Sequence, residues 1–205
     1  MSTSLLGDPL RSRTHSKTEE MTMFQLPPIP ALDGLHPLII HFPIALLFVA
    51  PIFVLVGAVL QPRRGRPLLY SALVLMVLGT ASIFVAIESG EAAAKLADRT
   101  PEINRVIEHH EDFAENTRLA FSILTVVFAG VLFVPMALKK ELSRVASTVL
   151  PLAFLCIYLG GMLMVANTAD QGGRLVHQYG VHSMVAPEGA PANAAQPAQP
   201  TNDKD

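Results

Sequence analysis

Histidines are the side chains of this sequence best suited to chemistry. Six of the seven lie in three short stretches: His36 and His41, His109 and His110, and His177 and His182. Neutral imidazole is the commonest nitrogen ligand for zinc and copper, and it is also an axial ligand of haem iron. No spacing among these residues matches a specific metal motif such as HExxH. The histidines therefore predict a bound cofactor without choosing among haem b, zinc and copper.

The first histidine pair opens an apolar stretch. If His36 caps a helix, Pro37 takes the first helical position, where a missing N–H costs nothing. His41 then lies about one turn inside the helix and about 140° around its axis from His36. The two rings are therefore expected to make different contacts rather than to share one ion.

Two prolines follow in the same stretch. Pro43 and Pro51 cannot donate to the carbonyls of Ile39 and Leu47, so each can kink the helix. A carbonyl freed in lipid needs another partner, which a neighbouring helix or a cavity must supply.

Four apolar runs without Asp, Glu, Lys or Arg must position these residues. The chain is 51% hydrophobic and only 16% charged, and its mean hydropathy is +0.42. About 20 apolar residues cross a hydrocarbon core of about 30 Å, and in lipid such segments must be helices. We therefore predict an all-α integral membrane four-helix bundle with disordered termini, in contact with the lipid bilayer. Its helices are expected at about 37–60, 67–88, 117–138 and 145–167.

The remaining segments complete the predicted organisation. Residues 1–30 form a polar N-terminal tail, 31–182 the membrane domain, and 183–205 a tail rich in Ala and Pro that is expected to be disordered. Residues 89–116 are expected to form an outer loop.

The short loops predict the orientation. Six cations and one acid, Glu141, lie in the two loops at one end of the bundle, and this end is cytoplasmic by the positive-inside rule. Three cations of the N-terminal tail are the contrary signal. Both termini and the histidines are then extracytoplasmic. The loop cations are Arg63, Arg64, Arg66, Lys139, Lys140 and Arg144, and the tail cations are Arg11, Arg13 and Lys17.

A haem b site needs two axial histidines on different helices. We predict His41 as one ligand and either His109 or His110 as the other, with weaker contributions from His36 and His177. Arg118 and Arg174 are expected near the haem propionates. Nearby acids are expected to orient the rings, and small residues to admit the macrocycle. The acids are Glu108, Glu111, Asp112 and Glu115, and the glycines are Gly79, Gly130, Gly160 and Gly161.

Two other functions remain open at this stage. The same histidines can bind zinc or copper for sensing or assembly, through His36, His41, His109, His110 and His177. The protein can also be a structural subunit of a membrane complex, with its histidines hydrogen-bonded at the membrane interface. In each case we expect a carrier or binding subunit rather than a catalyst. The net charge of −2 does not suggest a nucleic-acid partner, and the lone Cys156 excludes an internal disulfide.

The stretch "LHPLIIHFPIALL" at residues 35–47 resembles the signature HPLxVHFPIAL of a bacterial membrane protein family called domain of unknown function 2231. The family pattern continues with a histidine before the third helix, here His109 and His110. It ends in a GGxLV motif, here "GGRLVHQYGV" at residues 172–181. The resemblance covers roughly residues 31–182. In the family we expect tyrosine at position 177 and often histidine at 179, whereas this chain has His177 and Tyr179.

The resemblance implies a bacterial inner (cytoplasmic) membrane location and a redox neighbourhood. Domains of this family occur fused to cytochrome c-like or Rieske domains, so redox proteins of these kinds are the implied partners. The protein is expected to form a homo- or hetero-oligomer. With the histidines, the resemblance favours a b-type haem and electron transfer.

Overall fold

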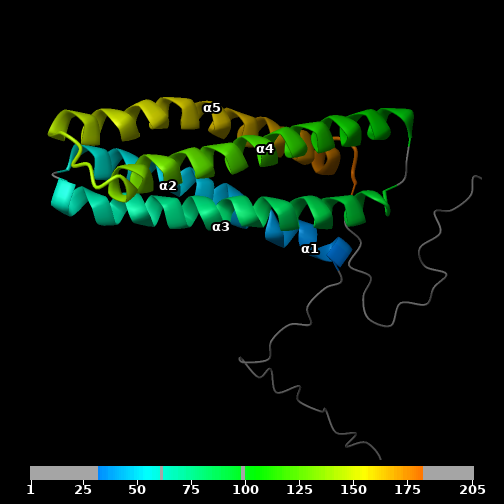
Figure 1. The fold of residues 1–205 in the computed structure, drawn as a ribbon. Helices are drawn as coiled ribbons and strands as arrows, with labels where there is room; N and C mark the ends of the chain where they lie inside the picture. The colour runs from blue at the N-terminus through cyan, green and yellow to red at the C-terminus, as the bar shows by residue number, and fades with distance from the viewer. Residues whose placement is uncertain (1–31, 61, 98–99, 182–205) are drawn as a thin grey trace, which may run out of the picture.

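A computed structural model describes residues 32–60, 62–97 and 100–181, and within them the protein is a bundle of helices with no strand (Figure 1). The predicted tails lie outside these residues, as does His182. The helices are α1 (Leu32–Ile39), α2 (His41–Val59), α3 (Pro62–Ala94), α4 (Pro101–Ala137) and α5 (Arg144–His177).

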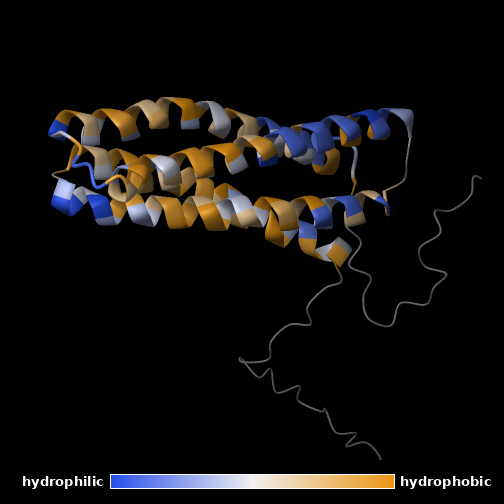
Figure 2. Ribbon diagram, viewed as in Figure 1, coloured by the Kyte–Doolittle hydropathy of each residue, from blue (hydrophilic) through white to orange (hydrophobic). Residues whose placement is uncertain are grey.

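Among the described residues, four helical segments are long and apolar enough to cross a membrane. They are Gly34–Val59, which joins α1 to α2, and then α3, α4 and α5. Figure 2 shows their apolar residues as a band flanked by polar residues at both ends. Many large apolar side chains point outward, such as Val126 at 71% and Leu163 at 68% exposure, as expected for a surface facing lipid. The predicted all-α membrane bundle is confirmed.

Two helical hairpins make up the bundle. α2 packs along α3 with α1 beside it, α4 packs along α5, and contacts of α3 with α4 and of α2 with α5 join the hairpins. We call the end with the α2–α3 turn and loop 138–143 the basic end, at the left of Figure 1. The opposite end contains α1, the end of α3, the start of α4 and the end of α5, and we call it the histidine end.

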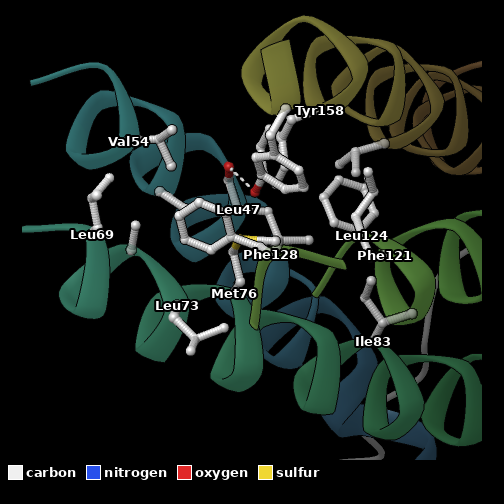
Figure 3. Close-up of a cluster of buried hydrophobic side chains, with 14 residues drawn as sticks. Leu47, Val54, Leu69, Leu73, Met76, Ile83, Phe121, Leu124, Phe128 and Tyr158 are labelled. Atoms are coloured by element: carbon white, nitrogen blue, oxygen red, sulfur yellow. Dashed lines mark hydrogen bonds between the residues drawn. The ribbon is translucent and has the colours of Figure 1, made fainter. Parts of the chain in front are cut away.

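Aromatic and aliphatic side chains fill the centre between the hairpins (Figure 3). Phe121 and Tyr158 are completely buried and meet edge to face, with ring centroids 5.4 Å apart. Phe128 and Phe154 stack with centroids 4.6 Å apart. Such pairs contribute about 0.5–1.5 kcal/mol each beyond the area they bury. The predicted glycines divide into two groups: Gly79 and Gly161 receive core side chains, whereas Gly130 and Gly160 have open space around them.

Pro43 and Pro51 bear on the first span in different ways. The helix is interrupted at Ile40, between α1 and α2, three residues before Pro43. Pro51 leaves the carbonyl of Leu47 without its helical donor, and the Tyr158 hydroxyl of α5 donates to that oxygen at 2.8 Å. The partner that the freed carbonyl requires therefore comes from a neighbouring helix.

The helices extend well beyond the uncharged runs. Most of the segment 89–116, expected as an outer loop, is helical: α3 continues to Ala94, and α4 begins at Pro101. Thr100 caps α4 by accepting a hydrogen bond from the Ile103 amide at 3.3 Å. Ile103, Val106 and Ile107 are buried, with the helical spacing of an amphipathic face. Counting only charge-free residues misses such turns because their outer faces are charged.

Candidate functional site

His36 of α1 is held against α3 at the histidine end. Its Nδ1 lies 3.0 Å from the carbonyl oxygen of Ala86 and 3.0 Å from the hydroxyl of Ser89. The Ser89 hydroxyl itself donates to Ala86 at 2.9 Å, and Ser89 is fully buried. A carbonyl oxygen only accepts, so Nδ1 must carry the proton in these bonds. In the neutral ring, Nε2 then keeps its lone pair.

His110 of α4 is held against α5 in the same way. Its Nδ1 donates to the carbonyl oxygen of Thr168 at 3.0 Å. The Thr168 hydroxyl donates to the carbonyl oxygen of Met164 at 2.9 Å and lies 3.0 Å from the hydroxyl of Thr117. These polar contacts link α4 to α5 beside His110. The neutral His110 ring also keeps its lone pair on Nε2.

Each histidine ring lies against a neighbouring helix, and we call the residues that hold it a histidine seat. The seats of His36 and His110 have the same construction. In each, the accepting carbonyl is followed four residues later by a glycine: Ala86 by Gly90, and Thr168 by Gly172. Residues four apart share one helix face. A Cβ atom at Gly90 would lie 3.0 Å from Cε1 of His36, and one at Gly172 would lie 3.1 Å from Cε1 of His110. Each glycine therefore makes room for an imidazole ring to lie flush against the helix.

The two hairpins thus contribute one oriented imidazole each. Both rings are half-buried at the histidine end. Within the described segments, neither Nε2 atom has a hydrogen-bond partner. Two imidazole lone pairs, from α1 and α4, are therefore free for a ligand.

The other predicted histidines are not held in this way. His41, the first residue of α2, is exposed, and so are His109 and His177. The helix break at Ile40 separates His36 from His41. Of the two α4 candidates left open by the sequence, His110 is the one turned toward a neighbouring helix. Among residues 32–60, 62–97 and 100–181, no group of three or more His, Cys, Asp or Glu side chains is arranged to hold a metal ion.

The two predicted arginines are half-buried and already have partners. Arg118 pairs with Glu115 and lies over the Phe84 ring, 5.4 Å from its centroid. Arg174 donates to Gln171 at 3.4 Å and to Gln178 at 3.3 Å. Arg118 therefore reaches from α4 to α3, and the contacts of Arg174 stay at the end of α5.

The ring-orienting acceptors differ from those expected. We predicted the acids near His110, but Glu108, Glu111 and Asp112 are exposed, and backbone carbonyls hold both rings instead. The seat residues of α3 and α5 were missed by the sequence reasoning. The available signal was a glycine near the outer end of an apolar run, in "ESGE" for Gly90 and in "GGRLV" for Gly172.

Comparison with known proteins gives one match. The sequence pattern of a family described as predicted membrane proteins, DUF2231, matches residues 32–184. No curated protein and no solved structure matches the chain.

Proposed function

Because the chain belongs to the DUF2231 family of predicted membrane proteins, and because two of its histidines are oriented at one end of a membrane bundle, we propose that it transfers electrons through a b-type haem. In this proposal the imidazoles of His36 and His110 would hold the haem iron at the histidine end. The protein is an electron carrier rather than a catalyst.

The observation that carries the proposal is the pair of fixed Nδ1 atoms. Ligating histidines almost always donate their other ring N–H to a carbonyl or carboxylate, which sets the tautomer and raises the basicity of the ligating nitrogen. His36 and His110 both do this, and their Nε2 lone pairs have no other partner among the described residues. The two rings come from separate hairpins, His36 from the α1–α3 side and His110 from the α4–α5 side.

The number of ligands favours haem over zinc. A structural zinc site uses four protein ligands and a catalytic site three, whereas haem iron needs only two from the protein. The described residues offer two oriented imidazoles and no cluster of three metal-binding side chains. Zinc or copper bound by the same histidines is the alternative, and the experiment below distinguishes it from haem.

The residues of this chain have distinct tasks in the proposed site. When bound, the haem supplies one-electron redox chemistry. His36 and His110 would hold the iron, and the carbonyls of Ala86 and Thr168 keep both rings in the ligating tautomer. Arg118 and Arg174 carry the positive charge that propionates require, and each would share or leave its present partner to supply it.

The exposed acids suggest where a redox partner docks. Glu102, Glu108, Glu111 and Asp112 lie on the exposed face of the first turns of α4. A soluble cytochrome c-like protein with a basic surface would be steered toward this end by charge. The positive charge of the opposite loops supports an extracytoplasmic position for this end.

An absorption spectrum of the purified protein tests the haem proposal. We expect a reduced-minus-oxidised spectrum with a haem b α-band and about one haem per chain by pyridine haemochrome assay. The protein should be prepared from haem-replete cells, with metal analysis of the same sample. A colourless protein with stoichiometric zinc or copper would support the alternative site. A protein with neither would support the role of a structural subunit.

A further inference from the structure

A cavity opens at the basic end of the bundle, far from the histidines. Its volume is about 340 Å³, within the range of roughly 300–1,000 Å³ typical of small-molecule sites. It is enclosed by residues of α2, α3, α4 and α5 together with loop 138–143. Its walls are mainly apolar and include Leu69, Tyr70, Leu132, Leu150 and Pro151.

The charged residues of the cavity are mostly cations. Arg66 of α3 and Lys139 and Lys140 of the loop line it, against a single acid, Glu141. All three cations are exposed, and none has an ion pair among the described residues. The cavity therefore combines an apolar interior with an excess of positive charge.

Lys139 has a backbone conformation that lysine seldom adopts. Lys139 has a φ of 51°, the single positive φ of a non-glycine residue in the described segments. Here α4 ends in a reversed turn, in which the Lys140 amide donates to the Pro135 carbonyl at 3.0 Å. Glycine is the usual residue at this position because it avoids the steric cost of a Cβ atom. A lysine with an unfavourable backbone conformation therefore borders the cavity.

We propose that this cavity binds one anionic phospholipid. Arg66, Lys139 and Lys140 hold the phosphate, and part of an acyl chain lies among the apolar wall residues. Basic pockets between membrane helices at the headgroup level suit the headgroups of anionic lipids. A neutral isoprenoid quinone would fill the apolar walls but would make no use of the three cations. This proposal does not depend on the haem.

Lipid titration of the full-length protein in detergent, followed by native mass spectrometry, tests the site. The probes are phosphatidylglycerol and phosphatidylcholine with identical acyl chains. The test variant is Arg66→Gln/Lys139→Gln/Lys140→Gln, and the matched control is Arg63→Gln/Arg64→Gln/Arg144→Gln. Both remove three charges from the same end, but the control residues do not line the cavity.

We expect the wild type and the control variant to prefer phosphatidylglycerol by about tenfold or more, since each cation near a headgroup contributes about a fivefold effect. The cavity variant should lose most of this preference. Equal loss in both triple variants would show a general surface charge effect and would overturn the proposal. Retention in the cavity variant, or no preference in the wild type, would also overturn it.

A second variant tests the apolar part of the cavity without changing its charge. Ser147 lines the cavity and is half-buried, so Ser147→Phe places a ring in the space assigned to the acyl chain. We expect weaker binding of phosphatidylglycerol with unchanged helical content. Unchanged binding would contradict the placement of the chain. If a quinone displaced phosphatidylglycerol equally from the wild type and the triple cavity variant, the occupant would be a quinone. The lipid proposal would then be overturned.

Discussion

His36 and His110 are distinguished by what holds them. The carbonyls of Ala86 and Thr168 accept from their Nδ1 atoms, and Gly90 and Gly172 provide the space for their rings. An exposed histidine such as His109, one residue away, loses conformational entropy on ligation, whereas a seated ring is already ordered. The orientation of the two rings therefore depends on residues of α3 and α5 that are not themselves histidines.

The glycine seats give a test at the level of single atoms. In Gly172→Ala the new Cβ would lie 3.1 Å from Cε1 of His110, so the ring must move by a few tenths of an ångström. We expect haem affinity to fall about tenfold, as is typical when the support of a ligand is disturbed. Haem titration of the apoprotein measures this change.

The adjacent glycine is the matched control for that variant. Gly173 has no atom within 4 Å of its Cβ position, so Gly173→Ala should leave haem affinity unchanged. Gly90→Ala should act on His36 as Gly172→Ala acts on His110. Equal affinities for Gly172→Ala and Gly173→Ala would mean that the His110 seat does not support a ligand.

At the scale of helices, the sequence predicts the positions of the spans better than it predicts the contacts of the site residues. Charge-free runs identify the four spans because lipid admits few charges, and Pro51 identifies a carbonyl that needs a partner from another helix. The polar turns of α4 were not predicted, since their amphipathic pattern at Ile103, Val106 and Ile107 is short and surrounded by charges.

The path and rotation of the helices explain why the contacts of the histidines differ from those expected from the sequence. The sequence reasoning expected a helix that starts near Pro37, with His41 facing inward one turn later. Instead, α1 begins at Leu32 and the helix breaks at Ile40, and His41 is exposed. Adjacent His109 and His110 could not be separated because spacing does not show which face of α4 meets α5. That information is contained in tertiary packing.

The hydrogen bond between Tyr158 and Leu47 links two of these helices, and Tyr158→Phe removes it. The Leu47 carbonyl is then left without a donor, because Pro51 has no N–H. We expect a loss of about 1 kcal/mol in the free energy of unfolding. Unfolding in a mixed detergent system measures it.

A double-mutant cycle with Pro51→Ala shows whether the proline is the reason. The substitution restores the missing helical N–H, so Tyr158→Phe should cost less than half as much in that background. An equal cost in both backgrounds would mean that the hydroxyl serves another purpose than satisfying this carbonyl.

At the scale of the whole molecule, the two ends of the bundle have different characters. The basic end carries the lysines and arginines of the loops, and the histidine end carries the acids of α4 and the two seated rings. We expect the basic end to face the cytoplasm because positively charged loops are retained there. Both termini would then be extracytoplasmic.

Thiol labelling in intact cells tests this orientation. In a Cys156→Ala background, Glu102→Cys should react with a membrane-impermeant reagent, whereas Arg64→Cys should react only after lysis. Both positions are exposed. Labelling of Arg64→Cys but not Glu102→Cys in intact cells would reverse the proposed topology.

The assignment of the two ligands is the central claim, and haem content across four alanine variants tests it most directly. His36→Ala and His110→Ala should each reduce haem per chain by about tenfold or more, with helical content unchanged by circular dichroism. His41→Ala and His109→Ala, which change exposed neighbours in the same two segments, should retain a full complement. Full haem content in the His36 and His110 variants, or loss confined to His41 and His109, would contradict the account.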